Sequence, residues 1–433
     1  MEEILAKAKK AAEEAEVFMV SSEDTSVHFE TNRLKHVQSK QSVSVSLRVI
    51  KNGRIGYATA TTLDNAQELV NMAVETAQFG QKAEFQFPGL TDYHQFRIFD
   101  ASVAKVSPET MTGLGGEMIA KIIKHTPGLL CEGVVGWSTE TVNLMNSRGG
   151  QVSYKSSDFS LGIEAQLVRD TDMLFVGESA TSCRPILETK EITSVILRQL
   201  DWAKRQASVR TKSMPVVFTT QGVASALVSP LMAAFNGKTV LEGASPIGTR
   251  LGQLVFDKRF SLHDDPTVSY RPSTRPCDDE GVTSRRTPLI KRGVVSNFLY
   301  DLQTAGLAKT RSTGNGNRGR GSMPAPSPSA FIITPGTTTF DEMVSDIKEG
   351  LVVEQLMGAT QGNVLGGDFS GNVLLGYKIE NGKIVGRVKD TMVSGNIYKL
   401  LNEIAAIGSE SKWEGSFLYT PPLYLNNVSV ASK

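Results

Sequence analysis

Polar and apolar residues alternate over much of the first sixty positions with the period of two that is typical of β-strands. Every second residue from Val43 to Val49 is apolar, Asn52-Gly53 follows, and Arg54 to Ala60 resumes the alternation. Asn-Gly suits the two positive-φ positions of a tight turn, so this pattern predicts a β-hairpin. Two shorter strands are predicted before it, at Val17 to Val20 and Thr25 to Glu30.

Helical spacing marks four stretches of the first half of the chain. Thr62-Leu63-Asp64 offers an N-cap, and apolar residues then recur at helical spacing from Leu69 until Gly80 ends the run. The pattern predicts helices at residues 2–15, between Asp64 and Gly80, at 108–124 and at 188–207.

The segments between these helices differ in their hydrophobic periodicity and residue composition. Residues 81–105 lose periodicity and predict a connector. Gly128 to Ser179 is rich in strand-forming residues around a turn at Arg148-Gly149-Gly150, which predicts a meander. The order of hairpin then helix, followed by sheet then helix, hints at a duplicated unit.

From Pro215 onward the chain becomes a glycine-rich succession of strand candidates. Strands are expected at 216–219, 252–256, 288–300, 331–335 and 371–388, with a second hairpin turn at Asn381-Gly382, and helices at 341–348 and 396–407. Runs of strands with segregated helices predict an α+β fold: an N-terminal α/β region of hairpins and packed helices, and a large, mainly antiparallel-β C-terminal domain. The predicted divisions are residues 1–90, 91–208 and 209–433.

Composition limits the kinds of binding partner and the cellular compartment that we expect for this chain. Of 433 residues, 40% are hydrophobic and 21% charged, and the net charge of +1 gives no global attraction to nucleic acid or to anionic lipid. The charged, Ala-rich start does not resemble a signal peptide, and no run of eighteen apolar residues follows. Three widely spaced cysteines suit a reducing cytosol. We therefore expect a cytoplasmic protein with no membrane or nucleic-acid partner.

Two phosphate-binding patterns occur in the wrong context. Gly314 to Gly319 matches the spacing of a dinucleotide site, but Pro324, Pro326 and Pro328 follow it, so no helix can begin there. Gly237-Lys238-Thr239 resembles the end of a phosphate loop whose first glycine is replaced by Met232. Neither pattern predicts a nucleotide site.

Other polar clusters have ordinary structural explanations that compete with a chemical role. Arg311, Arg318 and Arg320 fall in a Gly/Asn loop, for which a solvated or interface position is favoured over contact with nucleic acid. His263-Asp264-Asp265 and Cys277-Asp278-Asp279-Glu280 contain atoms that bind metals, but acids before Pro or Gly commonly make turn hydrogen bonds. A metal site there stays an open alternative.

Several spaced motifs agree in order with one family. They are Gly366 to Gly371, Gly376 to Val385, Val393 to Ile397, Asp278 to Gly281 and Thr313 to Arg318. With them the chain resembles the TldD/PmbA family, associated with a zinc-dependent peptidase and once called modulators of DNA gyrase. The match runs from Phe29–Lys35 to Pro422–Leu425. It implies an α/β N-terminal region, a mainly β C-terminal domain, and a dimer that encloses a cavity.

Active members of that family carry a His-Glu-x-x-x-His helix and a cysteine close to the C-terminus, and neither is present here. Counted from the strand at Val216 to Phe218, the resemblance puts Val228, Ser229 and Ala233 at the His, Glu and His places. The segment Trp413 to Leu418, where the cysteine would lie, has no thiol. Because a catalytic zinc needs imidazole or thiolate ligands and a general base, we expect no metal cofactor and a likeness to the PmbA/TldE branch.

The resemblance implies a metal-free subunit of a cytosolic peptidase, which builds one wall of a peptide-holding cavity and pairs with a zinc-bearing TldD-like chain. One alternative is a stand-alone homodimer that binds peptides or regulates. Another is a divergent hydrolase using His263 and the acids near Asp278. The candidate peptide-binding residues, through backbone pairing, are Gly366, Gly367, Asp368, Phe369 and Ser370. A tight turn or bulge explains the same glycines equally well.

Overall fold

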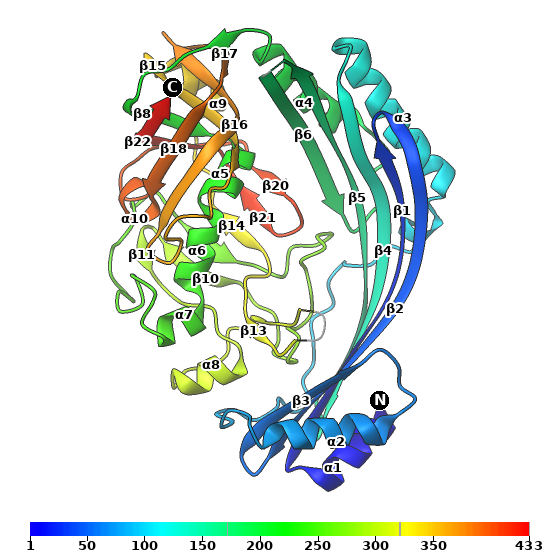
Figure 1. Cartoon of the computed structure of the whole chain (residues 1–433). Coiled ribbons are helices and arrows are strands. Elements are labelled where there is room, and N and C mark those ends of the chain that lie inside the picture. Colours follow the sequence, from blue (N-terminus) through cyan, green and yellow to red (C-terminus); the bar gives the residue numbers. More distant parts are fainter. Residues whose placement is uncertain (171, 320–321, 433) are drawn as a thin grey trace.

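A computed structural model of the chain describes residues 1–170, 172–319 and 322–432. It has a long antiparallel sheet formed by the N-terminal half and a β-rich C-terminal domain beside that sheet (Figure 1). The predicted α+β fold is confirmed. None of the helices in the described ranges combines the length and the apolar character needed to cross a membrane.

The N-terminal sheet has six strands in the order β3-β2-β1-β4-β5-β6. Every neighbouring pair in it is antiparallel. The strands are β1 (Glu14–Glu30), β2 (Arg33–Lys51), β3 (Arg54–Ala60), β4 (Leu130–Asn146), β5 (Gln151–Arg169) and β6 (Asp172–Ser182). Strands from both sides of residue 90 share this sheet, and the divisions near residues 90 and 208 stay predictions.

The two short strands expected at residues 17–20 and 25–30 are parts of one strand, β1, which has 17 residues. Their separation was predicted because the residues between them are polar. β1 pairs with β2 on one side and with β4 on the other, so backbone hydrogen bonds continue through the polar stretch. Its side chains also find partners, since the hydroxyls of Ser22 and Ser42 lie 2.7 Å apart.

Both predicted hairpin turns are confirmed. Asn52 and Gly53 have φ angles of 50° and 69°, and Asn381 and Gly382 have 50° and 76°. These left-handed conformations are the ones that Asn and Gly adopt most readily, so the local sequence fixes these turns.

Four helices cover one face of the sheet. They are α1 (Glu2–Ala11), α2 (Ala66–Ala77), α3 (Pro108–His125) and α4 (Lys190–Trp202). The first two pack at the end near β3, and α3 and α4 pack at the other end. The units α1-β1-β2-β3-α2 and α3-β4-β5-β6-α4 repeat one order of elements and meet where β1 pairs with β4. The cap of α2 is Asn65, not the predicted Thr62-Leu63-Asp64 segment, because its side chain accepts a hydrogen bond from the Glu68 amide.

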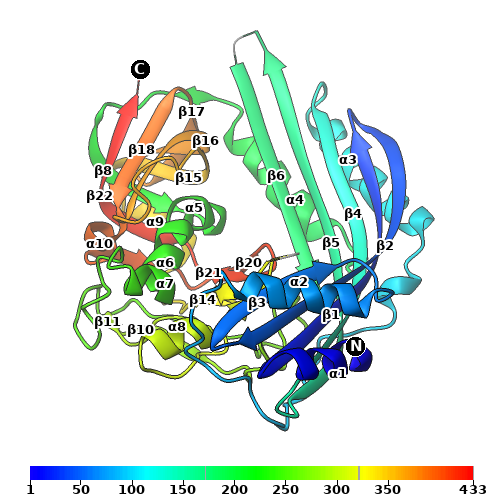
Figure 2. The ribbon, with the colours of Figure 1, turned by 60° about the horizontal axis from the view of Figure 1, so that its bottom comes forward.

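The opposite face of the sheet turns toward the C-terminal domain and is called the inner face below. Figures 1 and 2 show α3 on the side of the sheet away from that domain. Apolar residues of the inner face, among them Phe18 and Leu144, pack with Cys277 of the C-terminal domain.

The described residues of the C-terminal domain form two large sheets. One has eight strands and closes on itself, because β15 pairs with both β8 and β16; its strands are β7 (Gln206–Ala207), β8 (Lys212–Phe218), β15 (Glu349–Met357), β16 (Asp368–Glu380), β17 (Lys383–Val388), β18 (Thr391–Asn396), β19 (Ile404–Ile407) and β22 (Leu423–Ser432). The other consists of β9 (Leu262–Asp264), β10 (Thr287–Lys291), β11 (Val294–Val295), β14 (Phe331–Ile333), β20 (Lys412–Glu414) and β21 (Leu418–Thr420).

Short elements complete this domain. A small pair is formed by β12 (Gly316–Asn317) and β13 (Ala325–Pro326). The helices are α5 (Thr220–Ala226), α6 (Val228–Phe235), α7 (Gly237–Leu241), α8 (Leu302–Leu307), α9 (Phe340–Ser345) and α10 (Ile397–Leu400).

Three predictions for this domain are wrong. Residues 252–256 form no strand and make only a bridge between Leu254 and Val294. The helix predicted at 396–407 stops at Leu400, because residues 404–407 instead pair with β22 as β19. The single strand expected over 288–300 divides into β10 and β11, because Arg292 and Gly293 turn the chain with φ angles of 48° and 78°, and β11 ends at Val295.

The C-terminal domain contacts the sheet at both ends. At the end near β3, Arg318 forms a buried ion pair with Glu16 of β1. At the other end, Arg387 pairs with Asp172, and the Gln199 side-chain amide donates to Glu354 over 2.6 Å. Arg318 and Glu354 of these two attachments each line one of the pockets described next.

Candidate functional site

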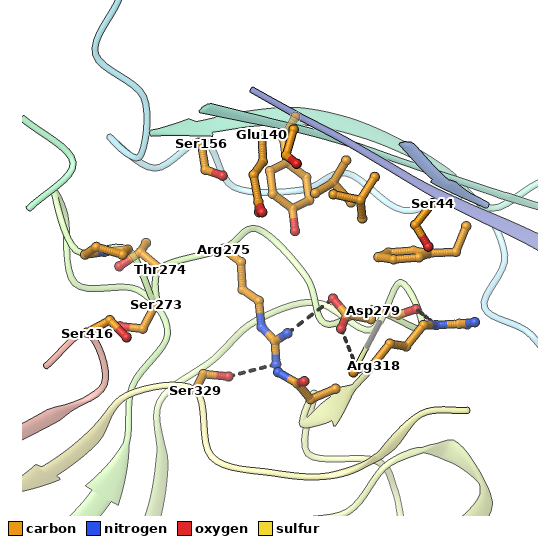
Figure 3. Close-up of a pocket in the computed structure, with 18 of the residues that line it drawn as sticks. Ser44, Glu140, Ser156, Ser273, Thr274, Arg275, Asp279, Arg318, Ser329 and Ser416 are labelled. Carbon is orange, nitrogen blue, oxygen red and sulfur yellow. Dashed lines mark hydrogen bonds and ion pairs between the residues drawn. The ribbon is translucent and has the colours of Figure 1, made fainter. Parts of the chain in front are cut away.

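Serine side chains line a cavity of about 410 Å³ between the inner face and the loops of the C-terminal domain. Even-numbered residues of β2 point to the inner face, so Ser42, Ser44 and Ser46 present three hydroxyls in a row. This cavity, the serine pocket, also contains Ser22, Ser156, Ser273, Ser329 and Ser416. Figure 3 shows Ser44, Glu140 and Ser156 on the sheet side, across from Thr274, Arg275 and Asp279.

A buried arginine forms the floor of the serine pocket. Arg275 lies 3.3 Å from the Asp279 carboxylate and donates to the Ser329 hydroxyl over 2.8 Å (Figure 3). Among the described residues its Nε has no hydrogen-bond partner. Burial lowers the pKa of Arg275, but the negative charges of Asp279 and Asp278 raise it by more. The net shift of the pKa is therefore upward, and the guanidinium stays charged.

The acidic side chains at and near Asp278 accept hydrogen bonds from backbone amides and pair with arginine side chains. The Asp278 carboxylate accepts hydrogen bonds from the amides of Glu280, Val282 and Gly316, over 2.8–3.0 Å. Asp279 accepts from the Arg318 amide over 2.7 Å. Two of the sequence motifs, Asp278–Gly281 and Thr313–Arg318, therefore stabilise each other.

Arg318 occupies the interface position favoured from the sequence. Its side chain is 3% exposed and pairs with Glu16 across the two parts of the chain. Arg320 lies outside the described residues.

His263 does not join the acids near Asp278. Its Nδ1 lies 3.4 Å from an Arg286 Nη2, and burial together with that cation lowers the pKa of His263 to about 4. The neighbouring Asp264 accepts from the amides of Ser329 and Ala330. Within the described ranges, no three His, Cys, Asp or Glu side chains are grouped so that they would hold a metal ion.

The candidate segment Gly366–Ser370 lies at a turn and the start of β16. Gly367 has φ +87°, and a Cβ there would meet a Tyr398 ring carbon at 2.4 Å, so only glycine fits. Residues 368–370 pair with β18, and the Asp368 amide donates to the Asn363 carbonyl over 3.0 Å. The segment does not line the serine pocket, and its role in peptide binding stays a prediction.

The positions that the resemblance assigns to two zinc ligands and the general base lie on α6. Val228 is 4% exposed and packs in the core of the C-terminal domain. The Ser229 hydroxyl and the Ala233 methyl complete the set. Imidazole, thiolate and carboxylate are the ligands that zinc takes in proteins, so these three side chains do not fit a zinc site.

Carboxylates gather in a second pocket, of about 680 Å³, between α5 and the inner face of β4, β5 and β6. Glu132 and Glu164 face each other on neighbouring strands, and Glu178 and Glu414 lie at the same pocket. We call it the sheet pocket. Like charges on directly opposed strand positions repel, so this part of the sheet attracts cations.

A third pocket, of about 510 Å³, is lined by residues of α4, α9, β6, β15 and β20 and is called the Glu354 pocket. Glu178 and Gln221 line both this pocket and the sheet pocket, so the two are neighbours. Burial raises the pKa of Glu354 to about 7, and burial likewise raises the pKa of Glu414 to about 7.

Sequence reasoning missed this group of glutamates. A signal was present, because Glu354 interrupts the apolar run Leu351-Val352-Val353, and charged residues are rarely buried in such a strand without a reason. Glu178 and Glu414 gave no comparable signal, since the fold alone brings them together.

Comparisons with known proteins agree with this architecture. Residues 211–432 match the model of the PmbA/TldA metallopeptidase C-terminal domain, and residues 15–77 match that of PmbA/TldA metallopeptidase domain 1. An uncharacterized protein of Methanocaldococcus jannaschii is 27% identical over 93% of both chains. A metalloprotease PmbA homolog of Haemophilus influenzae is 24% identical over 98% of this chain and 93% of its own.

Two solved structures share the fold. TldE from Thermococcus kodakarensis superposes with a TM-score of 0.90 at 22% identity, over 100% of both chains. A proposed modulator of a DNA gyrase from Thermotoga maritima gives a TM-score of 0.89 at 22% identity, over 99% of both chains.

Proposed function

Because the chain belongs to the PmbA/TldD metallopeptidase family, we propose that it is a metal-free subunit of a peptidase. In this role it forms one wall of a cavity in which a zinc-bearing TldD-like partner cleaves peptides or unfolded segments. The observation that carries the proposal is α6, where Val228, Ser229 and Ala233 stand at the places assigned to the metal ligands and the base.

The chemistry of these side chains supports a non-catalytic role. Hydrolysis by zinc requires ligands that keep one metal position open, and a base that takes the proton of the attacking water. Isopropyl and methyl groups supply no lone pair, and a serine hydroxyl is a poor base at neutral pH. What this chain offers is binding surface, so we assign it the positioning of substrate.

The inner face supports the peptide-holding part of the proposal. An extended peptide carries amide and carbonyl groups along its whole length, and hydroxyls both donate and accept hydrogen bonds. The row Ser42, Ser44 and Ser46 repeats with the two-residue period of a strand. The serine pocket therefore suits the backbone of an unfolded segment with little regard to its side chains.

We retain the segment 366–370 as a second peptide contact within this proposal. Cys131, Cys183 and Cys277 are buried, so Asp368→Cys creates a single exposed thiol for a photo-crosslinker. We expect the labelled chain to crosslink to an added unfolded peptide, while Glu242→Cys with the same label does not. Equal crosslinking at both positions removes this segment from the proposed site.

The experiment for the function itself compares the chain alone with the chain mixed with a zinc-bearing TldD-like protein. We expect no hydrolysis of denatured casein by the chain alone, and chelator-sensitive hydrolysis by the mixture that exceeds that of the partner alone. Light scattering should detect a heterodimer. Chelator-sensitive hydrolysis by the pure chain would show that it is itself catalytic.

The alternative is a stand-alone homodimer that binds peptides without cleaving them. The fold shared with the proposed gyrase modulator from Thermotoga maritima favours keeping this candidate. A stable homodimer that binds peptide but leaves the activity of the TldD-like protein unchanged would favour it over the subunit role.

A further inference from the structure

Glu354 is placed by an irregularity of its strand. In the pairing of β15 with β16, Val353 lies opposite Gly376 and Gln355 lies opposite Leu375, so Glu354 is an extra residue at a β-bulge. Bulges turn a side chain away from the regular strand direction and are common beside sites. Here the bulge directs a carboxylate into the Glu354 pocket.

The two oxygens of this carboxylate have different surroundings. Glu354 is 2% exposed. Its Oε2 accepts a hydrogen bond of 2.6 Å from the Gln199 side chain. Its Oε1 has no hydrogen-bond partner among the described residues. A buried, unpaired carboxylate oxygen is costly, so its persistence beside a cavity points to a ligand that completes it.

The pocket around Oε1 carries more negative than positive charge. The side chains at its wall include the acids Glu178, Asp341 and Glu410 and the bases Arg198 and Lys412. Neither base donates a hydrogen bond to Oε1: Lys412 forms an ion pair with Glu178, and the Arg198 guanidinium lies 5.0 Å from the Trp202 ring centre and acts on Glu354 only through its charge. A cation from outside the chain is therefore the favoured occupant.

Aromatic rings give the pocket an apolar wall. Trp202 and Phe340 stack with ring centres 5.8 Å apart, and both line the pocket. A lysine side chain has four methylene groups that pack on such rings and a compact ammonium at its end. The volume of about 510 Å³ leaves room for a chain of that size.

From these contacts we propose that the Glu354 pocket binds a primary alkylammonium group, with the Glu354 Oε1 as the acceptor of its hydrogen bond. An arginine fits less well, since its planar fork takes both oxygens of a carboxylate and Gln199 already occupies Oε2. The shared residues Glu178 and Gln221 connect this pocket to the sheet pocket, so a lysine of a peptide held on the inner face can reach it. This assignment of substrate class rests on the proposed function.

The test uses the full chain and three blocked tripeptides, acetyl-Gly-X-Gly-amide with X as lysine, arginine or norleucine, in calorimetric titrations at pH 8. We expect the lysine peptide to bind at least about tenfold more tightly than the other two. Equal affinity for norleucine and lysine overturns the proposal. Cadaverine is a separate arm: binding as tight as that of the lysine peptide identifies free diamines, and not peptides, as the source of the ammonium.

Glu354→Gln keeps the shape of the side chain and an oxygen for Gln199, and it removes the charge. We expect this variant to lose the preference for lysine over norleucine, while Glu242→Gln, which removes an exposed charge at the C-cap of α7, keeps it. Thermal unfolding of both variants verifies that they fold. A lysine preference that survives Glu354→Gln contradicts the proposal.

The direction of the pH effect separates the ammonium from a neutral ligand. Arg198, Glu178 and Glu414 act on Glu354 from α4, β6 and β20, Lys412 is paired with Glu178, and none of them replaces the missing hydrogen bond of Glu354. Affinity for the lysine peptide should rise between pH 6 and pH 8 as Glu354 loses its proton, whereas affinity that falls over this range indicates a carbonyl ligand bound by the protonated acid.

Failure here is distinct from failure of the proposed function. If the chain stimulates a TldD-like partner on lysine-free casein fragments but shows no lysine preference, only the assignment of the Glu354 pocket is wrong. If lysine peptides bind as expected but no partner is stimulated, the subunit role is wrong and the ammonium site remains.

Discussion

Arg48 on β2 and Glu280 in the C-terminal domain form a 2.5 Å ion pair in which neither side chain is more than 2% exposed. Arg48 also lies 3.0 Å from Glu16. One guanidinium thus neutralises a carboxylate of its own sheet and a second carboxylate that lies 232 positions further along the chain. This pair is one of the buried contacts that hold the inner face against the C-terminal domain.

Arg48→Met should strongly destabilise the protein, because it leaves Glu16 and Glu280 buried without this cation. We expect a loss of about 3–5 kcal/mol in the free energy of unfolding, measured by urea denaturation. As a control, Lys7→Ala removes the exposed pair between Lys7 and Glu3 and should cost less than about 1 kcal/mol. Equal costs for the two variants would show that the buried pair adds nothing specific.

Stability should fall as the pH rises from about 5 to 8. Burial raises the pKa of Glu354 from 4.5 to about 7, so the folded state holds this proton more tightly than the unfolded state does. The stabilisation that this proton gives to the folded state is fully present below about pH 4.5. Up to about 3 kcal/mol of the free energy of unfolding is lost by pH 7, as Glu354 ionises. Urea denaturation of Glu354→Gln should show a shallower pH dependence. An unchanged slope would mean that other groups are responsible.

Gly367→Ala should cost more than Gly149→Ala. Both glycines have positive φ, +87° and +84°, but a Cβ at residue 149 has nothing within 4 Å, whereas at residue 367 it meets Tyr398. The control therefore measures backbone strain alone, and the excess at Gly367 should be about 1–3 kcal/mol by thermal or urea unfolding. A matching cost at both sites would mean that Tyr398 moves aside freely.

The purified chain is expected to contain no stoichiometric zinc. Val228, Ser229 and Ala233 supply no zinc ligand, and no three His, Cys, Asp or Glu side chains among the described residues, His263 included, are grouped to hold a metal ion. Elemental analysis of protein prepared with zinc in the medium measures this directly. About one zinc per chain that disappears in His263→Ala would restore the divergent-hydrolase alternative.

Local sequence predicted the elements whose causes are local. The Asn52-Gly53 hairpin and α3 follow from a turn dipeptide and from helical spacing. The strand β19 was read as helix because its short apolar run fits either period, and only pairing with β22, from the far end of the chain, decides between them. The continuity of β1 likewise depends on neighbours on both sides.

The candidate site was harder to predict for the same reason. The serine pocket combines β2 with loops near residues 275 and 416, and no sequence motif spans those distances. The motif Asp278–Gly281 was noticed for its acids, yet its role is to fasten the C-terminal domain to the sheet. Glu354 alone carried a visible signal, as a charge inside an apolar strand.

Attachment of the C-terminal domain at both ends of the sheet has a consequence for what can enter between them. A domain attached at only one end of the sheet could swing away and admit a folded protein. Attachment at both ends instead fixes the width of the opening between the domain and the sheet. Under the proposed function, an opening of fixed width would select substrates by their cross-section and not by their side chains. A single unfolded strand could enter, and a folded domain would stay outside. Native proteins would then be protected from cleavage because the opening does not widen.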